Sequence, residues 1–292
     1  MFEEILFPTD GSDGATFAFD HVLDLAARHD ATVHVLNVAD TTQNGLLEIR
    51  GADVDALEQE GDRIVREAAK KADKRGVDTV TDVVRGEPYR EIVDYTEHHG
   101  LDLVVMPTHG RRGLERFLLG STSERVVRTA DVPVLTMRPD DDVTISHPYQ
   151  NVLVPTDGSN CANQALAIGV DVADAEDATL HLLSVIAITA LGADARPDIR
   201  MEMLEESAHE LLDEAAAFAD DAGVEPASTT VEYGPSIHKA ILAYVDDHDI
   251  DLVVVGTHGR TGFDRYVLGS VTEYLVRTSP IPVLTVQPPD PA

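Results

Sequence analysis

The sequence has very little cysteine, no tryptophan and no long apolar run. Cys161 is the only cysteine, so no disulfide can form within the chain, and we expect an ordinary small residue, buried or half-buried on a helix. No apolar run reaches the ~20 residues that a membrane-spanning helix needs. The N-terminus is acidic and has no basic region of the kind that begins a secretory signal. The sequence therefore predicts a cytoplasmic protein.

Basic residues are also scarce. The chain has 22 lysines and arginines against 53 acids, a net charge of −31, and its few lysines are Lys70, Lys71, Lys74 and Lys239. A chain this acidic is a poor partner for nucleic acid or for an anionic membrane surface. The acids are spread over segments that still show apolar faces, which argues against a disordered acidic tail. An acidic, lysine-poor surface suits a cytoplasm of very high salt, where self-repulsion is screened over a few Å, so we expect a halophilic source.

One stretch of the sequence occurs twice. Asp251–Thr285 aligns with Asp102–Thr136 without a gap. In each copy an apolar run predicts a buried strand, a glycine-rich loop follows, and a helix opens at a serine with a glutamate three residues later, a capping-box signature. A mere linker has little reason to keep so many loop residues in both copies. The matched residues include His109, Gly110, Arg111, Gly120, Ser121 and Glu124 in the first copy, and His258, Gly259, Arg260, Gly269, Ser270 and Glu273 in the second.

The rest of the chain repeats in the same order. Asp10-Gly11-Ser12 and Asp157-Gly158-Ser159 each follow a short apolar strand. Strands then alternate with helices, which predicts an α/β fold with a parallel sheet and right-handed crossovers. We expect two tandem doubly wound domains, each with a five-stranded parallel sheet, at residues 1–139 and 151–288. Residues 140–150 form the predicted linker.

Ligands of such sheets bind at the carboxyl ends of the strands, where the strand order reverses. The predicted site therefore comprises the ends of strand one (Asp10, Asp157), the ends of strand two (Val38, Val185) and the loop after strand four. Glycines let a backbone approach a ligand closely, and a helix N-terminus offers unpaired N–H groups. This indicates anion capture, to which the Ser270 hydroxyl and the Arg260 charge would add. The alternatives are structural: Ser270 is only an N-cap, the glycines only turn a corner, and the two aspartates only form Asx turns.

The sequence PTDGS after strand one, together with GTHGRTGFDRYVLGS after strand four, resembles the universal stress protein family. The resemblance covers nearly the whole chain, once per half. It implies a Rossmann-like fold of the adenine-nucleotide-binding type, in which the loop holds the ribose and phosphates of ATP, ADP or AMP. Gly256, Gly259, Gly269 and Ser270 fit the family's loop pattern fully. The acid after strand one and the residue ending strand two would contact the adenosine part, at Asp157 and Val185 or at Asp10 and Val38.

The first half departs from the family pattern at one position. Pro107 stands where the family has its first glycine, and proline has no N–H to donate and adds a ring. The rest of the pattern remains, so phosphate capture can survive, and the second half is the better candidate. The remaining loop residues of the first half are Gly110, Arg111, Gly120 and Ser121.

Three functions stay open at this stage. The first is a stress-response or regulatory binding module, in which Mg²⁺ arrives with the triphosphate and no protein side chain ligates a metal. The second is a slow nucleotide hydrolase or phosphotransferase, which is less favoured because no lysine lies near either aspartate. The third is a ligand-free dimeric scaffold. The apolar fifth strands would lie at sheet edges, so we expect the two halves to pair there as a pseudo-dimer, and a further homodimer stays open.

Overall fold

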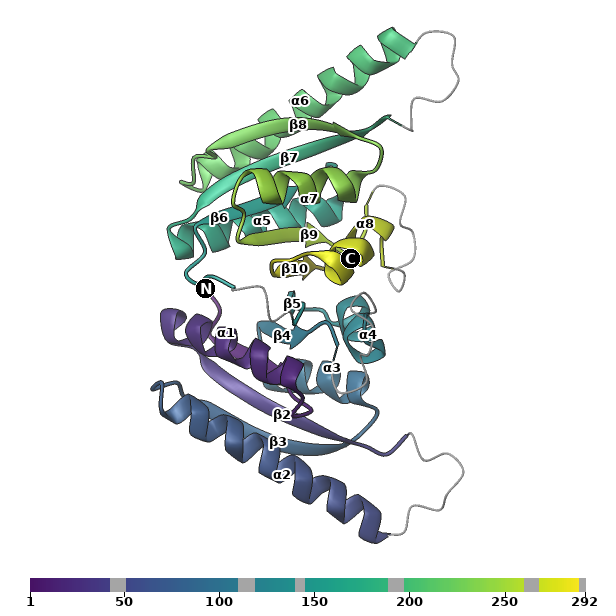
Figure 1. Cartoon of the computed structure of the whole chain (residues 1–292). Helices are drawn as coiled ribbons and strands as arrows, with labels where there is room; N and C mark the ends of the chain where they lie inside the picture. Colours follow the sequence, from purple (N-terminus) through teal and green to yellow (C-terminus); the bar gives the residue numbers. More distant parts are fainter. Residues whose placement is uncertain (43–50, 110–118, 140–144, 189–196, 260–267, 289–292) are drawn as a thin grey trace. The chain divides into compact units, whose positions relative to one another are not determined.

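The computed structural model describes residues 1–42, 51–109, 119–139, 145–188, 197–259 and 268–288. The chain divides into two compact units, Met1–Pro148 and Tyr149–Ala292 (Figure 1). No helix in these described ranges is long and apolar enough to cross a membrane.

The first unit alternates strands and helices. Its elements are β1 (Glu4–Pro8), α1 (Asp13–His29), β2 (Thr32–Asp40), α2 (Gly51–Asp73), β3 (Thr79–Gly86), α3 (Pro88–His99), β4 (Leu103–Pro107), α4 (Ser121–Thr129) and β5 (Val134–Met137). All of the pairings among these strands are parallel, and their order across the sheet is β3-β2-β1-β4-β5.

The second unit repeats this arrangement. Its elements are β6 (Asn151–Pro155), α5 (Asn160–Glu176), β7 (Thr179–Ala187), α6 (Pro197–Asp221), β8 (Ser228–Gly234), α7 (Ile237–Asp247), β9 (Leu252–Gly256), α8 (Ser270–Thr278) and β10 (Val283–Val286). The parallel order is β8-β7-β6-β9-β10. In each unit the chain order reverses between the first strand and the fourth, which confirms the predicted doubly wound α/β fold.

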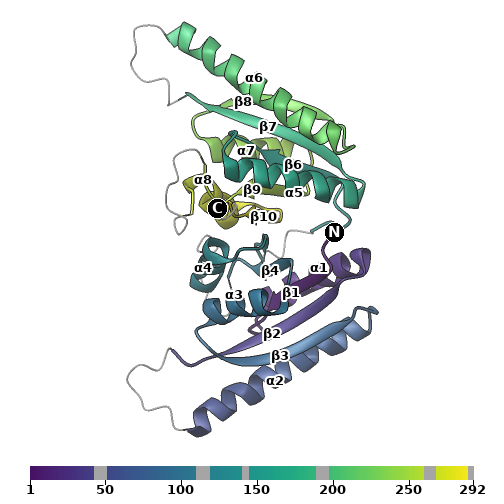
Figure 2. The ribbon, with the colours of Figure 1, turned by 180° about the vertical axis from the view of Figure 1, so that it is seen from behind.

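Helices cover both faces of each sheet. In the first unit α1 lies in front of the sheet in Figure 1, whereas α3 lies in front in Figure 2, which shows the opposite side. In the second unit α7 lies in front of the sheet in Figure 1, and α5 lies in front in Figure 2. The fourth strands run between these layers, and β4 and β9 are buried along their whole length. Burial on both faces explains why these strands read as continuous apolar runs in the sequence.

The first helix of each unit is fixed at both ends by local interactions. The side chains of Ser12 and Ser159 accept the N–H groups of Ala15 and Ala162, each at 3.2 Å, and so cap α1 and α5. Both helices end in an aspartate in the left-handed conformation. The lone cysteine, Cys161, lies in the first turn of α5 and is buried, as expected.

Candidate functional site

A tight turn follows the first strand of each unit. In the second unit the Ser159 N–H donates to Asp157 Oδ1 at 3.0 Å, and the Gly158 N–H donates to Thr156 Oγ1 at 3.2 Å. Gly158 has φ 74°, in the left-handed region that glycine tolerates. The first unit repeats the turn, with Ser12 N–H donating to Asp10 Oδ1 at 3.0 Å. Each aspartate therefore forms an Asx turn, which holds its carboxylate at the start of the helix that follows.

The second strand passes this turn and continues beyond it. We predicted that Val38 and Val185 would end their strands, which is wrong: β2 runs to Asp40 and β7 to Ala187. The reason is the outer strand, because the ladder between β7 and β8 continues to Gly234 and keeps β7 extended.

Val185 nevertheless lies at the predicted edge of the sheet. The Thr156 N–H donates to Leu183 O at 2.8 Å, just where β6 ends. Val185 is two residues farther along β7, so it shares a face with Leu183 and lies beside the turn that carries Asp157. Val38 has the same relation to Leu36, which accepts the Thr9 N–H at 2.8 Å.

Hydrogen bonds join the two ends of the loop after strand four. In the second unit the Gly269 N–H donates to Thr257 O at 2.8 Å, and the Thr272 hydroxyl donates to Gly256 O at 2.7 Å. These two bonds hold the N-terminus of α8 against the end of β9. The corresponding bonds of the first unit are Gly120 N–H to Thr108 O at 2.8 Å and Ser123 Oγ to Pro107 O at 2.9 Å.

The hydroxyls of Thr272 and Ser123 were missed in the sequence analysis. Both side chains are buried, and each donates to the last carbonyl of a strand. The available signal was a hydroxyl residue two positions after the Gly-Ser pair in both copies.

A glycine is the N-cap of the helix after the loop. The capping-box prediction is wrong, because Gly269 is the N-cap of α8 and Ser270 is the first helical residue. Glu273 instead pairs through its side chain with Arg277 at 3.1 Å. The physical reason is the backbone bonding, since Gly269 O accepts the Glu273 N–H at 2.8 Å while its own N–H is bound to Thr257 O.

The first unit departs from the prediction in the same way, with Gly120 as the N-cap of α4. Ser121 and Ser270 are exposed at the first helical position. A first turn without a side-chain cap leaves its N–H groups available to an anion.

Two further glycines of the second loop make close contacts. A Cβ at Gly259 would lie 2.8 Å from Asp157 Oδ2, so the loop backbone passes directly beside this carboxylate. A Cβ at Gly256 would lie 2.8 Å from Cys161 Sγ, in the first turn of α5. The structure thus brings together the turn at Asp157 and the loop, as the strand order predicts.

Three of the predicted site residues lie outside the described residues: Arg260, Gly110 and Arg111. The loop histidines pair with the threonine before them, with 3.1 Å from His109 Nδ1 to Thr108 Oγ1 and 2.9 Å from His258 Nδ1 to Thr257 Oγ1. Burial, and then the charge of Arg138, lower the pKa of His109.

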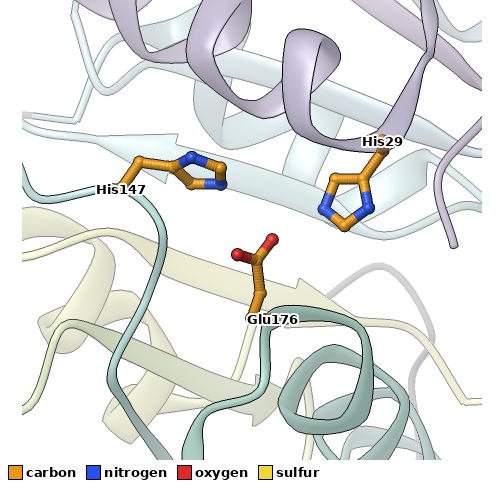
Figure 3. A group of neighbouring side chains, drawn as sticks. All are labelled: His29, His147 and Glu176. Carbon is orange, nitrogen blue, oxygen red and sulfur yellow. The ribbon is translucent and has the colours of Figure 1, made fainter.

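Three side chains of the types that ligate metals are drawn in Figure 3. They are His29, which ends α1, His147 from the segment before β6, and Glu176, which ends α5. His29 and His147 belong to the first unit and Glu176 to the second, and we assign no metal site to them. The expectation that no protein side chain ligates a metal stays a prediction.

The fold and the site define a class: a tandem pair of doubly wound α/β domains, each with a glycine-rich loop between strand four and a helix N-terminus. The sequence model of the Universal stress protein family matches residues 1–138 and again 148–287. The chain belongs to the universal stress protein family.

Some similar proteins match one half of this chain, and others match both halves. Universal stress protein MJ0531 of Methanocaldococcus jannaschii is 37% identical over 141 residues, which are 47% of this chain and 83% of that protein. Universal stress protein Rv2005c of Mycobacterium tuberculosis is 28% identical over 236 residues, 79% of this chain and 78% of that protein. The crystal structure of a universal stress protein from Archaeoglobus fulgidus has a TM-score of 0.75 and 25% sequence identity, and the match covers 98% of each chain.

Proposed function

We propose that this chain binds ATP, or the related nucleotides ADP and AMP, at the carboxyl ends of β6, β7 and β9. The nucleotide-bound protein acts as a stress-response or regulatory binding module in the cytoplasm. The observation that carries the proposal is the approach of the Gly259 backbone to the Asp157 carboxylate. This contact brings the turn after strand one against the loop after strand four, at the edge where doubly wound sheets bind nucleotides.

Each part of this candidate site suits one part of a nucleotide. The first turn of α8 offers N–H groups and the positive end of a helix dipole to phosphates. The exposed Ser270 hydroxyl can add a donor there. Asp157 presents a carboxylate that can accept hydrogen bonds from ribose hydroxyls, and Val185 offers an apolar surface to the base. Mg²⁺ would enter with the triphosphate, since it prefers phosphate oxygens and water.

The first unit has the same frame with one difference. Asp10, Val38 and Gly120 occupy the equivalent positions, and Ser121 is exposed at the start of α4. Pro107 ends β4 where Gly256 ends β9. A proline supplies no N–H and carries a ring, so we propose a weaker or differently tuned site in this unit.

We propose a binding module and not an enzyme. Asp157 already accepts the Ser159 N–H through Oδ1, so its carboxylate fits the role of a positioned acceptor better than that of a nucleophile. The pairing of the two halves, and any homodimer, stay predictions from the sequence.

The proposal is tested by calorimetric titration of ATP, ADP and AMP in high-salt buffer with Mg²⁺. The wild type is compared with Gly269→Val and with the matched variant Gly120→Val of the first unit. A valine at 269 puts a Cβ 3.1 Å from Thr257 O and adds two methyl groups, so it displaces the base of the second loop. We expect saturable binding in the wild type, loss of the stronger site in Gly269→Val and retention of that site in Gly120→Val.

Two results would contradict the proposal. One is a folded wild type, checked by circular dichroism, that binds none of the three nucleotides. The other is a folded Gly269→Val variant that binds with unchanged affinity and stoichiometry, which would put the ligand elsewhere.

A further inference from the structure

In the second unit the end of β9 touches the backbone of α5. A Cβ at Gly256 would lie 2.8 Å from Cys161 Sγ and 2.9 Å from both the carbonyl carbon and the carbonyl oxygen of Cys161. Real Cβ atoms essentially never come this close to backbone atoms. The contact between strand and helix therefore requires glycine on the strand.

The Cys161 side chain reinforces this contact. Its thiol donates to Val286 O at 3.2 Å, and the same carbonyl accepts the Thr257 N–H at 2.9 Å. Cys161 Sγ also lies 3.7 Å from Thr257 Oγ1. The thiol thus ties the first turn of α5 to the ends of β9 and β10, at the point where the glycine loop leaves the sheet.

The first unit has different residues at both positions of this contact. The counterpart of Gly256 is Pro107, and the counterpart of Cys161 is Gly14. A Cβ at Gly14 would lie 2.9 Å from His109 O and 2.9 Å from Pro139 Cγ. Each unit therefore has a glycine that permits a close approach: in the first unit it lies on the helix, against His109 and Pro139, and in the second it lies on the strand, against Cys161. A loop carbonyl and a proline ring lie against the helix where the second unit has a thiol.

We propose that residues 161 and 14 are positioning residues that set how the glycine loop leaves the sheet. In the first unit Gly14 has no side chain and the strand ends in Pro107, whereas in the second unit the helix carries Cys161 and the strand ends in Gly256. Each combination acts as one pair, and the second pair suits the nucleotide-binding loop. The two pairs exchange as units, so replacement of Pro107 alone does not create a second strong nucleotide site. This inference rests on the proposed function for its ligand, whereas the pairing of the residues can be tested without one.

The first test is a double-mutant cycle in the first unit: Gly14→Cys, Pro107→Gly and the combination of both. Gly14→Cys alone places a side chain against His109 O and Pro139, so we expect a lower unfolding temperature. Pro107→Gly alone leaves His109 O against Gly14, so we expect no additional strong nucleotide site. In the combined variant the thiol can bond to Met137 O, the counterpart of Val286 O. We expect this variant to unfold at a higher temperature than Gly14→Cys and to bind an additional nucleotide per chain.

The second test uses conservative variants in the second unit. Cys161→Ser keeps a donor for Val286 O, whereas Cys161→Ala removes it. We expect Cys161→Ala to weaken nucleotide binding by about threefold, the effect of one modest hydrogen bond, and Cys161→Ser to restore most of the affinity. Equal affinities in the alanine and serine variants would overturn the positioning role of the thiol.

Different results would overturn the pairing of these residues and the proposed nucleotide binding. A combined variant that is no more stable than Gly14→Cys overturns the exchange of pairs, whether or not any nucleotide binds. A second strong site in Pro107→Gly alone overturns it as well. Absence of nucleotide binding in the wild type would contradict the proposed function and leave the stability cycle as the test of the pairing.

Discussion

Asp157 and Gly259 lie so close that a Cβ at position 259 would be 2.8 Å from Asp157 Oδ2. The other carboxylate oxygen, Oδ1, accepts the Ser159 N–H at 3.0 Å. The Asp157 side chain is therefore fixed by the turn on one side and bounded by the loop backbone on the other. Position 259 matters for the site because it has no side chain.

We predict that Gly259→Ala weakens nucleotide binding by about tenfold, the effect of one or two displaced hydrogen bonds. The added methyl group pushes Asp157 Oδ2 away from its present place. Gly259 is exposed, so we expect the free energy of unfolding to change by less than ~0.5 kcal/mol. Calorimetric titration measures the affinity, and urea denaturation measures the stability.

Asp157→Asn is the matched control for this prediction. It keeps an oxygen that can accept the Ser159 N–H, so the turn should persist while the carboxylate charge is lost. We expect a similar loss of affinity. Unchanged affinity in both variants would remove the contact between Asp157 and the loop from the site.

The second prediction concerns a buried histidine in the second unit. His181 Nδ1 lies 3.1 Å from both Tyr244 Oη and Ser228 Oγ, whereas Nε2 has no hydrogen-bond partner among the described residues. Burial, and then the charge of His248, lower the pKa of His181. In the first unit the equivalent nitrogen, His34 Nε2, lies 3.0 Å from Glu4 Oε2. The second unit has Asn151 at the position of Glu4.

A lowered pKa means that the folded protein prefers neutral His181, whereas the unfolded chain takes up the proton near pH ~6.5. The contribution of His181 to stability is therefore complete above pH ~6.5 and is lost as the pH falls toward its folded-state pKa. We predict that Asn151→Glu, which supplies a partner for Nε2, reduces the loss of stability between pH ~7.5 and ~5. Thermal unfolding of both proteins across this range measures the effect.

Asn151→Gln provides the control. It adds a side chain of the same length as glutamate but without its charge, so we expect its pH profile to match that of the wild type. Parallel pH profiles for wild type and Asn151→Glu would contradict the role assigned to the missing acid.

Features set by local interactions could be predicted from the sequence. Local signals in the sequence mark the bounds of α1, Asp13–His29, and of β5, Val134–Met137. The Ser12 cap fixes the start of α1, and a proline directly before β5 separates it from α4. The doubly wound topology also followed from the sequence, because strands alternate with helices in both halves.

Features set by distant partners could not be predicted in this way. The end of β7 depends on its ladder with β8, and the cap of α8 depends on the hydrogen bond from the Gly269 N–H to Thr257 O. The contact between Gly256 and Cys161 joins residues far apart in the sequence, and neither residue signals the other. The sequence therefore located the candidate site but did not show which backbone contacts shape it.

The third prediction concerns the end of α5. Asp177 is exposed, and it has φ 57° in the left-handed region, which costs aspartate less than most residues but still more than glycine. Its negative charge also lies at the negative end of the helix dipole. We expect Asp177→Gly to raise the free energy of unfolding by about 0.5 kcal/mol, because relief of both costs slightly exceeds the added freedom of the unfolded chain. Urea denaturation measures the change.

Two variants check the cause of this effect. Asp30→Gly makes the same change at the end of α1, where Asp30 has φ 54°, and should have a similar effect. Asp177→Ala removes the charge but keeps the strained conformation, so it should be less stable than Asp177→Gly. If the alanine and glycine variants were equally stable, backbone strain would not explain the gain.

The last prediction concerns salt. With 53 acids against 22 basic residues, folding concentrates a net charge of −31. Screening acts over ~10 Å in 0.1 M salt and ~3 Å in 1 M salt, so repulsion between acids weakens strongly over this range. We expect the unfolding temperature to rise steeply as KCl increases from ~0.1 to ~1 M. Glu210 and Glu214 are exposed on α6, so changing both to lysine should stabilise the protein at low salt and matter less at high salt. A variant that gains equally at both salt concentrations would show that repulsion is not the cause, because only a charge effect disappears when salt screens it.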